Sequence, residues 1–159
     1  MIDRGSKPIG RVVATEILPA SPHQFHFWTP VEAPLGIGAI VRVDGTDGRV
    51  VHAVVTDARA YSDLATPLHD VLAAEGNPTG EAPTSRAEVR LWTAAVLRQV
   101  PEEPVQPVPR AAVRLATPED VETALRMDAF LRGERPTGVP VGLYTAGGLS
   151  SLVCSPRPA

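Results

Sequence analysis

Short apolar runs separated by turn residues dominate the first third of the chain. Val and Ile are frequent in three of these runs, and the second alternates polar with aromatic residues, as strands with one buried face do. Proline, glycine and aspartate fill the gaps between the runs. This pattern predicts four β-strands, over Ile9–Leu18, Gln24–Thr29, Ala39–Val43 and Arg49–Asp57.

Two glycine-containing gaps indicate how these strands connect. Asp44–Gly48 holds two Asp-Gly pairs, which tolerate positive φ and favour a hairpin between the third and fourth strands. Gly36 and Gly38 precede the third strand and allow a sharp bend there, because glycine has no Cβ to clash. We therefore expect a mainly β fold with a few helices, in which the strands close into a small β-barrel.

The middle of the chain is predicted to add a helical insert and one long strand. Thr66-Pro67 has the pattern of a helix start, so a short helix is expected over 66–76 and an exposed loop over Asn77–Ser85. Arg86–Val100 carries apolar residues at both the helical and the strand period. The barrel favours a strand in this segment, and a helix is the alternative.

The last third begins with prolines and ends in glycine and serine. Prolines at four positions exclude a central strand over Pro101–Pro109, which is predicted to be a linker or an edge segment. Short strands are expected over Ala111–Leu115 and Val139–Tyr144. The chain is thus read as one barrel domain over 1–145, with helical inserts near 66–76 and 117–132, and a tail over 146–159.

A second helix is predicted between these two strands. Thr117 is a suitable cap, Pro118 suits the first helical position, and the two acids that follow favour the positive end of the helix dipole. The helix is expected to run to about Arg132 and to end at Gly133. Its predicted buried residues are Val121, Ala124, Leu125 and Leu131.

Composition indicates one soluble domain in the 159 residues. Apolar residues make up 43% and charged residues 21% of the chain, and the 17 prolines suit short strands better than long helices. The formal charge of −3 gives no overall basic field for nucleic acid. Cys154 is the single cysteine, which excludes an intrachain disulfide and fits a cytoplasmic location. No signal peptide or membrane-spanning run is recognised, so no membrane association is expected.

No set of residues with catalytic spacing is found. A P-loop requires a Gly-Lys pair, which the sequence lacks, so this chain is not expected to hydrolyse ATP. His23 and His26 would face opposite sides of a strand and have no suitably spaced acidic or cysteine partner. We predict no catalytic, cofactor-binding or metal-binding residues, and therefore a chain that is not itself an enzyme.

Arginines and aromatic residues are the candidates for contact with other molecules. Phe25, Phe27 and Trp28 suggest a platform for stacking bases, but adjacent strand residues point to opposite sides, so at least one belongs to the core. The expected contact surfaces are the Asp44–Arg49 hairpin tip, the Tyr61–Leu64 segment and the Asn77–Arg86 loop. The residues predicted to touch a partner or DNA are Arg42, Arg49, Tyr61, Leu64, Arg86 and Arg90. The alternative is that these arginines are isolated surface residues without a role in contact.

Five segments together carry a family resemblance. They are Ile9–Val13, Gln24–Phe27, Gly36–Val43, Arg49–Val55 and Gly138–Leu143. In this order they resemble the HAS-barrel, the N-terminal barrel of HerA-type hexameric DNA translocases, which is similar to the N-terminal barrel of ATP synthase subunits. The last segment is similar to the stretch that leads out of the barrel towards the ATPase domain.

The resemblance implies a non-catalytic assembly and docking domain. Such barrels crown a hexameric homo-oligomer that acts on double-stranded DNA and docks a NurA-type nuclease during resection of double-strand break ends, a step of DNA repair by homologous recombination. The full-length parent is then an ATP-dependent translocase or helicase whose separate motor domain binds ATP and magnesium. The alternative is a stand-alone barrel that binds single-stranded nucleic acid or a protein partner.

Overall fold

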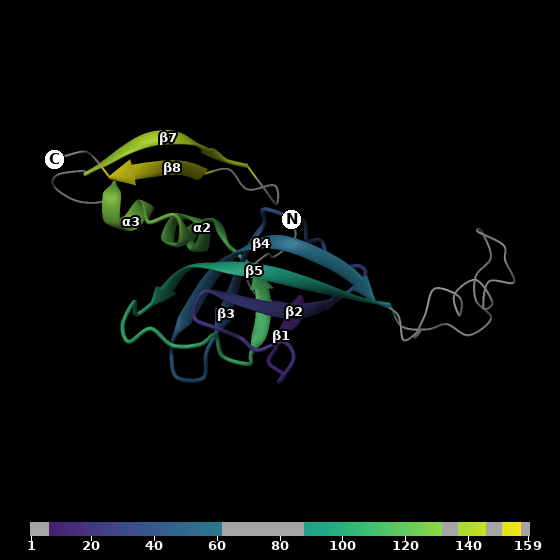
Figure 1. The fold of residues 1–159 in the computed structure, drawn as a ribbon. Helices are drawn as coiled ribbons and strands as arrows, with labels where there is room; N and C mark the ends of the chain where they lie inside the picture. The colour runs from purple at the N-terminus through teal and green to yellow at the C-terminus, as the bar shows by residue number, and fades with distance from the viewer. Residues whose placement is uncertain (1–6, 62–87, 132–136, 146–150, 157–159) are drawn as a thin grey trace, which may run out of the picture.

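Six antiparallel strands close into a barrel in the order β1-β2-β5-β4-β3-β6 (Figure 1). The computed structural model describes residues 7–61, 88–131, 137–145 and 151–156. The predicted mainly β fold and its closed barrel are confirmed, whereas the helix expected over 66–76 and the loop over Asn77–Ser85 lie outside the described residues. The barrel strands are β1 (Gly10–Val13), β2 (Gln24–Pro30), β3 (Ile40–Asp44), β4 (Val50–Tyr61), β5 (Val89–Val100) and β6 (Ala112–Leu115).

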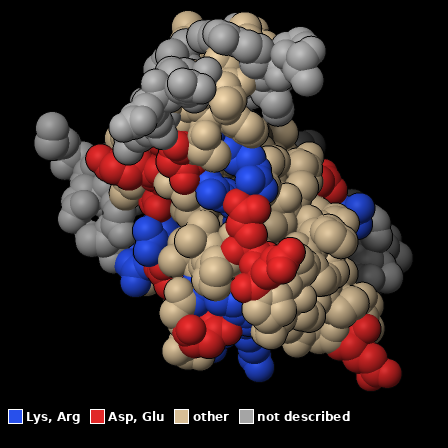
Figure 2. All heavy atoms as spheres, turned by 90° about the vertical axis from the view of Figure 1, so that its left-hand side faces the viewer, with Lys and Arg blue, Asp and Glu red and all other residues tan. Residues whose placement is uncertain are grey.

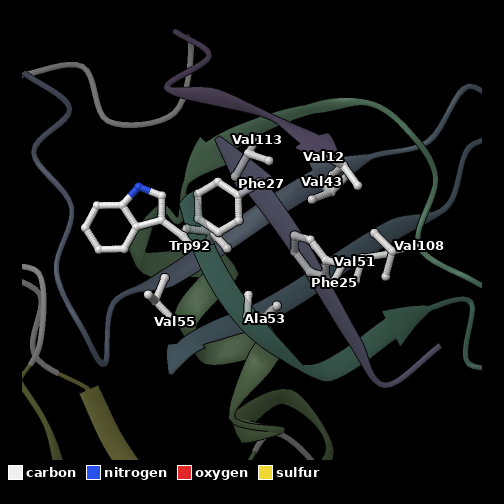
Figure 3. Packing of buried hydrophobic residues seen from close by; sticks show 12 residues of the cluster. Val12, Phe25, Phe27, Val43, Val51, Ala53, Val55, Trp92, Val108 and Val113 are labelled. Atoms are coloured by element: carbon white, nitrogen blue, oxygen red, sulfur yellow. The ribbon is translucent and has the colours of Figure 1, made fainter. Parts of the chain in front are cut away.

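Side chains at alternate strand positions fill the barrel (Figure 3). Phe25 and Phe27 of β2 are fully buried, and the ring of Phe27 stacks on Trp92 of β5 with 6.4 Å between the ring centroids. The indole N–H of Trp92 donates to Thr29 Oγ1 at 2.9 Å, so its polar edge is satisfied inside the barrel. Burying each such aromatic side chain stabilises the fold by about 1.5 to 3 kcal/mol. The valines that pack around these rings are Val12, Val41, Val43, Val51, Val55, Val108 and Val113.

The segment with two possible periods forms β5, a strand of twelve residues. It lies between β2 and β4 and pairs with both, so its backbone is hydrogen-bonded on each edge. Apolar residues occur on both faces of this strand. The face with Trp92 and Ala94 lines the core, and Val96, two residues further along the same face, packs against it.

β1 and β4 are the clearest departures from the predicted strand bounds. β1 ends at Val13 rather than Leu18, because the Leu18 N–H donates to Thr15 Oγ1 at 3.1 Å and closes a turn. β4 continues beyond Asp57 to Tyr61, because β5 supplies pairing partners as far as Val89. The sequence pattern marks apolar strands, and it misses a polar extension that is held by pairing alone.

The predicted hairpin between β3 and β4 is confirmed. The Gly45 N–H donates to Arg49 O at 2.7 Å, and the Gly48 N–H donates to Gly45 O at 3.2 Å. Gly48 has a φ of 84°, so the loop is a three-residue turn that ends in a left-handed residue. Gly38, with a φ of 85°, makes the bend that was expected before β3.

Two short helices, α2 (Pro118–Ala124) and α3 (Met127–Phe130), replace the single helix predicted to reach Arg132. The predicted start is confirmed, since Thr117 caps α2 and forms a capping box with Asp120. The prediction of a continuous helix is wrong because Arg126, with a φ of 59°, interrupts it. Of the four residues predicted to be buried, Val121 and Ala124 are buried and Leu125 and Leu131 are half-buried.

A second sheet of two strands lies against the helices (Figure 1). The strand predicted over Val139–Tyr144 is present as β7 (Gly138–Tyr144), and it pairs with β8 (Ser151–Pro156), which the sequence pattern did not predict. Tyr144 ties this hairpin to the barrel, because its hydroxyl donates to Gly38 O at 2.8 Å and accepts from the Ile40 N–H at 3.0 Å.

Candidate interaction surfaces

The residues predicted to touch a partner do not form one site. Arg42 and Arg49 lie near the β3–β4 hairpin, whereas Tyr61 and Arg90 lie at the other end of the β4–β5 ribbon. Because β4 has twelve residues at about 3.3 Å each, these ends are roughly 35 Å apart. Leu64 and Arg86 lie outside the described residues. We call the end of the barrel formed by 14–23, 45–49 and 101–111 the hairpin end, because strand register brings these three loops together.

Basic residues cross four neighbouring strands on the outside of the barrel. Arg42 of β3 is paired with Arg114 of β6 on one side and with His52 of β4 on the other, and His52 is paired with Arg98 of β5. Core residues flank three of them (Val41, Val51 and Val113), and Gln99 beside Arg98 is buried, so these four side chains share the outer face. We call them the basic row. Helices α2 and α3 lie over it and bring acidic side chains to it.

Asp120 of α2 is the central acceptor of this contact. Its Oδ1 accepts from Arg42 Nη1 at 2.9 Å and lies 3.2 Å from His52 Nε2, while its Oδ2 accepts from the Thr117 N–H at 3.0 Å. Burial alone would raise the pKa of Asp120, but the hydrogen bonds from His52, Thr117 and Arg42 outweigh it and hold this pKa well below its ordinary value. Asp120 is therefore an ionised carboxylate with its acceptor positions filled.

His52 is held in one tautomer by this contact. An ionised carboxylate only accepts, so His52 Nε2 carries the proton that points at Asp120. His52 is 3% exposed, and its Nδ1 has no hydrogen-bond partner in the part of the chain that the structure describes. The histidine therefore joins β4 to α2.

Arg98 fastens the second helix. Its Nη1 donates to both carboxylate oxygens of Asp128 at 2.7 and 2.9 Å and to Thr123 O at the end of α2 at 3.0 Å. Its Nε donates to Glu102, which also pairs with Arg126 at 2.9 Å. Since the bonds of Arg98 reach both sides of the break at Arg126, they fit the interrupted helix better than a continuous one.

The arginine at the hairpin tip is also engaged. Arg49 pairs with Asp47, and its side chain is only 13% exposed. The hydrogen bonds from Arg49 lower the pKa of Asp47. Figure 2 shows that acidic and basic groups alternate on this side of the molecule without a continuous basic area. Such a surface presents little net charge to a phosphate backbone.

A different set of outward residues lies on β1, β2, β5 and β4. Phe25 and Phe27 are core residues, as the alternation of β2 requires, while Trp28 is 42% exposed. Trp28 is paired with Arg11 on one side and with Leu91 on the other. Sequence reasoning named Trp28 but missed Arg11 beside it, because only strand pairing brings the two residues together.

Tyr61 and Arg90, both predicted contacts, take different positions on this ribbon. Tyr61 is 46% exposed and pairs with Val89, two residues along β5 from Leu91, so it shares the outer face with Trp28. Arg90 pairs with Thr29, whose side chain is buried, and therefore points towards the barrel mouth.

His26 bears on metal binding, and the helices bear on membrane crossing. His26 Nδ1 lies 3.1 Å from Thr93 Oγ1, so this histidine has a protein partner. Among the described residues, no group of three or more His, Cys, Asp or Glu side chains is placed to hold a metal ion. None of the helices in these described segments combines the length and apolar character needed to cross a bilayer.

Comparison of the chain with protein-family models gives no match, and comparison with curated proteins gives none. The structure shows a closed six-stranded barrel with two short helices and a two-stranded hairpin fastened to it.

Proposed function

We propose that this chain is a non-catalytic assembly and docking domain, the HAS-barrel of a HerA-like hexameric DNA translocase that works with a NurA-type nuclease in end resection. The observation that carries the proposal is the closed barrel itself, to which four of the five segments that resemble that family contribute strands. A closed barrel has few free strand edges, so it serves as a rigid spacer whose loops carry recognition.

The side-chain chemistry supports a structural role. The arginines nearest the helices are tied to carboxylates of α2 and α3, and Asp120 is hydrogen-bonded by three residues, Arg42, His52 and Thr117. These groups fasten helices to the barrel. In the proposed parent, ATP and magnesium are bound by a motor domain, since this chain has no Gly-Lys pair.

The hairpin end is the proposed docking surface for the nuclease. Its alternating acids and bases suit a protein partner, because complementary charges give specificity and register in protein interfaces. Exposed apolar side chains occur among these charges, with Ile17 89% and Val105 59% exposed. A polar rim around apolar contacts is the usual composition of such interfaces. In the proposed parent, a cytoplasmic homo-hexamer passes double-stranded DNA through the assembled ring.

Sedimentation of the chain with a NurA-type nuclease tests the proposal. We expect co-sedimentation at micromolar concentration for the natural chain, and at least tenfold weaker docking for Thr46→Arg, which adds bulk and charge at the exposed hairpin tip. Ile37→Arg is the matched control, because Ile37 is 59% exposed and lies before β3 at the opposite end of the barrel. Absence of co-sedimentation, or equal loss in both variants, would contradict the proposed surface.

A further inference from the structure

The outer face of β1, β2, β5 and β4 carries a row of two arginines with two apolar residues between them. Strand register places Arg11, Trp28, Leu91 and Arg59 directly side by side across these four strands. Trp28 alternates with the buried Phe27, and Leu91 with the buried Trp92, so the row points away from the core. Neighbouring strands are about 4.8 Å apart, which makes the row roughly 14 Å long.

A second row adds another aromatic ring. Pro30, Val89 and Tyr61 are paired across β2, β5 and β4, two residues further along each strand. Trp28 and Tyr61 are 42% and 46% exposed, and Val89 is 39% exposed. Their backbone positions are roughly 12 Å apart by strand geometry. Two exposed aromatic rings on one sheet face are the arrangement on which successive bases of a single strand stack.

The two arginines that border the apolar residues remain accessible. Arg11 is exposed and forms no ion pair within the described segments. The Arg59 side chain is 68% exposed, and Tyr61 raises the pKa of its guanidinium. Among the described residues its carboxylate neighbour is Asp57, which lies 3.5 Å away and is 54% exposed. An exposed pair of this kind contributes little, so a phosphate can replace the carboxylate.

We propose that this face, centred on Trp28, binds single-stranded nucleic acid. Bases stack on Trp28 and Tyr61, and Arg11 and Arg59 contact phosphates on either side. Charge favours a nucleic acid on this face, because accessible arginines border the exposed rings. The hairpin end, by contrast, presents alternating charges. The inference goes beyond nuclease docking and matches the alternative function that the sequence left open, at a site that adds Arg11, Leu91 and Arg59 to Trp28 and Tyr61.

Titration of an oligonucleotide of about 15 nucleotides into the full chain tests the site. Labelled oligo-dT and oligo-U, followed by fluorescence anisotropy at low salt, separate DNA from RNA as the source of the same chemistry. We expect Trp28→Ala to weaken binding about tenfold, because stacking on one aromatic ring is lost. Ile17→Ala is the control, since Ile17 is an exposed apolar residue away from this face, and it should leave binding unchanged.

Intrinsic fluorescence gives a second readout that a folding defect would not mimic. The chain has two tryptophans, and Trp92 is only 3% exposed, so a stacked base should quench Trp28 selectively. Trp28→Phe keeps an aromatic ring and should retain binding within about threefold while abolishing the quenching. Quenching that survives in Trp28→Phe would place the base elsewhere and overturn the assignment.

Salt dependence tests the arginines. For single strands, each lost phosphate contact reduces the slope of log K against log salt by about 0.7, so Arg11→Ala combined with Arg59→Ala should reduce it by roughly 1.4. Arg110→Ala, at an exposed arginine outside this face, is the control. A slope that the double variant shares with the control would overturn the phosphate contacts.

The outcomes separate this proposal from nuclease docking. Loss of oligonucleotide binding in Trp28→Ala with unchanged co-sedimentation supports the proposed site. An absence of oligonucleotide binding by the natural chain overturns it and leaves docking untouched. Co-sedimentation that is lost in Trp28→Ala, without any oligonucleotide binding, would assign the face to a protein partner. Equal affinity for a duplex would show that the bases are not read and would also overturn it.

Discussion

Arginines occur on two sides of this barrel and have opposite surroundings. In the basic row, Arg42 and Arg98 are bound by carboxylates of α2 and α3 at 2.7 to 2.9 Å, and Arg98 is 13% exposed. On the β1–β2–β5–β4 face, Arg59 is 68% exposed and its carboxylate neighbour is 3.5 Å away. The comparison shows that the availability of a charge depends on what the fold places opposite it. The first group fastens helices, and the second is accessible to a ligand.

Removing the central carboxylate should have the largest effect on this contrast. Asp120→Ala deletes the acceptor of Arg42, His52 and Thr117 and leaves the buried imidazole without a partner. We expect the free energy of unfolding to fall by about 3 kcal/mol, as when one partner of a buried pair is removed. Urea denaturation measures the change. Glu119→Ala, an exposed acid in the same helical turn, is the control and should cost less than about 1 kcal/mol. Equal losses would show that the Asp120 contacts do not fasten α2.

Lowering the pH should weaken the contacts of Asp120 by less than the Asp120→Ala substitution does. The pKa of Asp120 is lowered in the folded chain, so this carboxylate contributes stability that is fully present above its unfolded value of about 3.9. As the pH falls below that value, the unfolded chain binds the proton first and stability decreases. Hydrogen bonds of the protonated carboxyl retain part of the contact.

Urea midpoints measured from neutral pH downwards test this dependence. The natural chain should keep a nearly constant midpoint above about pH 5 and lose stability below about pH 4. Asp120→Asn should show a flatter profile over the same interval, because the group that titrates has been removed. Identical profiles for the two chains would assign the acid sensitivity to other carboxylates, of which Asp128 also has a lowered pKa, caused by Arg98 against the opposing effect of burial.

Replacing the guanidinium of Arg98 with an amine should have a still smaller effect on the free energy of unfolding. Arg98→Lys keeps the charge but cannot hold both oxygens of Asp128 together with Thr123 O, so we expect a loss of about 1 kcal/mol. Amide hydrogen exchange in α3 should accelerate more than exchange in β5, because the helix loses its fastening while the strand keeps its ladder. Arg110→Lys, at an exposed position, controls for the substitution itself. Unchanged exchange in α3 would contradict the role assigned to Arg98.

Much of the barrel was predictable because its signals are local. The alternation in β2, the Asp-Gly pairs at the β3–β4 turn and the Thr-Pro start of α2 are each contained in a few adjacent residues. The break at Arg126 was not predictable, because bonds from Arg98 on a distant strand accompany it. The missed strand β8 follows a glycine-serine stretch and has its partner in β7.

The surfaces were less predictable than the strands for the same reason. The hairpin tip was identified by its glycines, but the sequence does not reveal that Arg49 is 13% exposed and paired with Asp47. Trp28 and Tyr61 were noticed separately. The row that joins Arg11, Trp28 and Arg59 exists only through the register of four strands that are far apart in the chain. Pairing of distant strands, rather than the type of any residue, creates this face.

The smallest expected change in stability should produce a gain in binding. Asp57→Asn removes the carboxylate that lies 3.5 Å from Arg59, at an exposed pair whose loss should change the free energy of unfolding by less than about 0.5 kcal/mol. On the β1–β2–β5–β4 face the same change frees the guanidinium and removes a charge that repels phosphate. Oligonucleotide affinity should therefore rise by about two- to fivefold at low salt, and the gain should shrink as salt screens the charge. Glu119→Gln is the control, because it removes an acid from the helix side with the same change in net charge. An equal gain in affinity in this variant would mean that overall charge, rather than the neighbour of Arg59, controls binding.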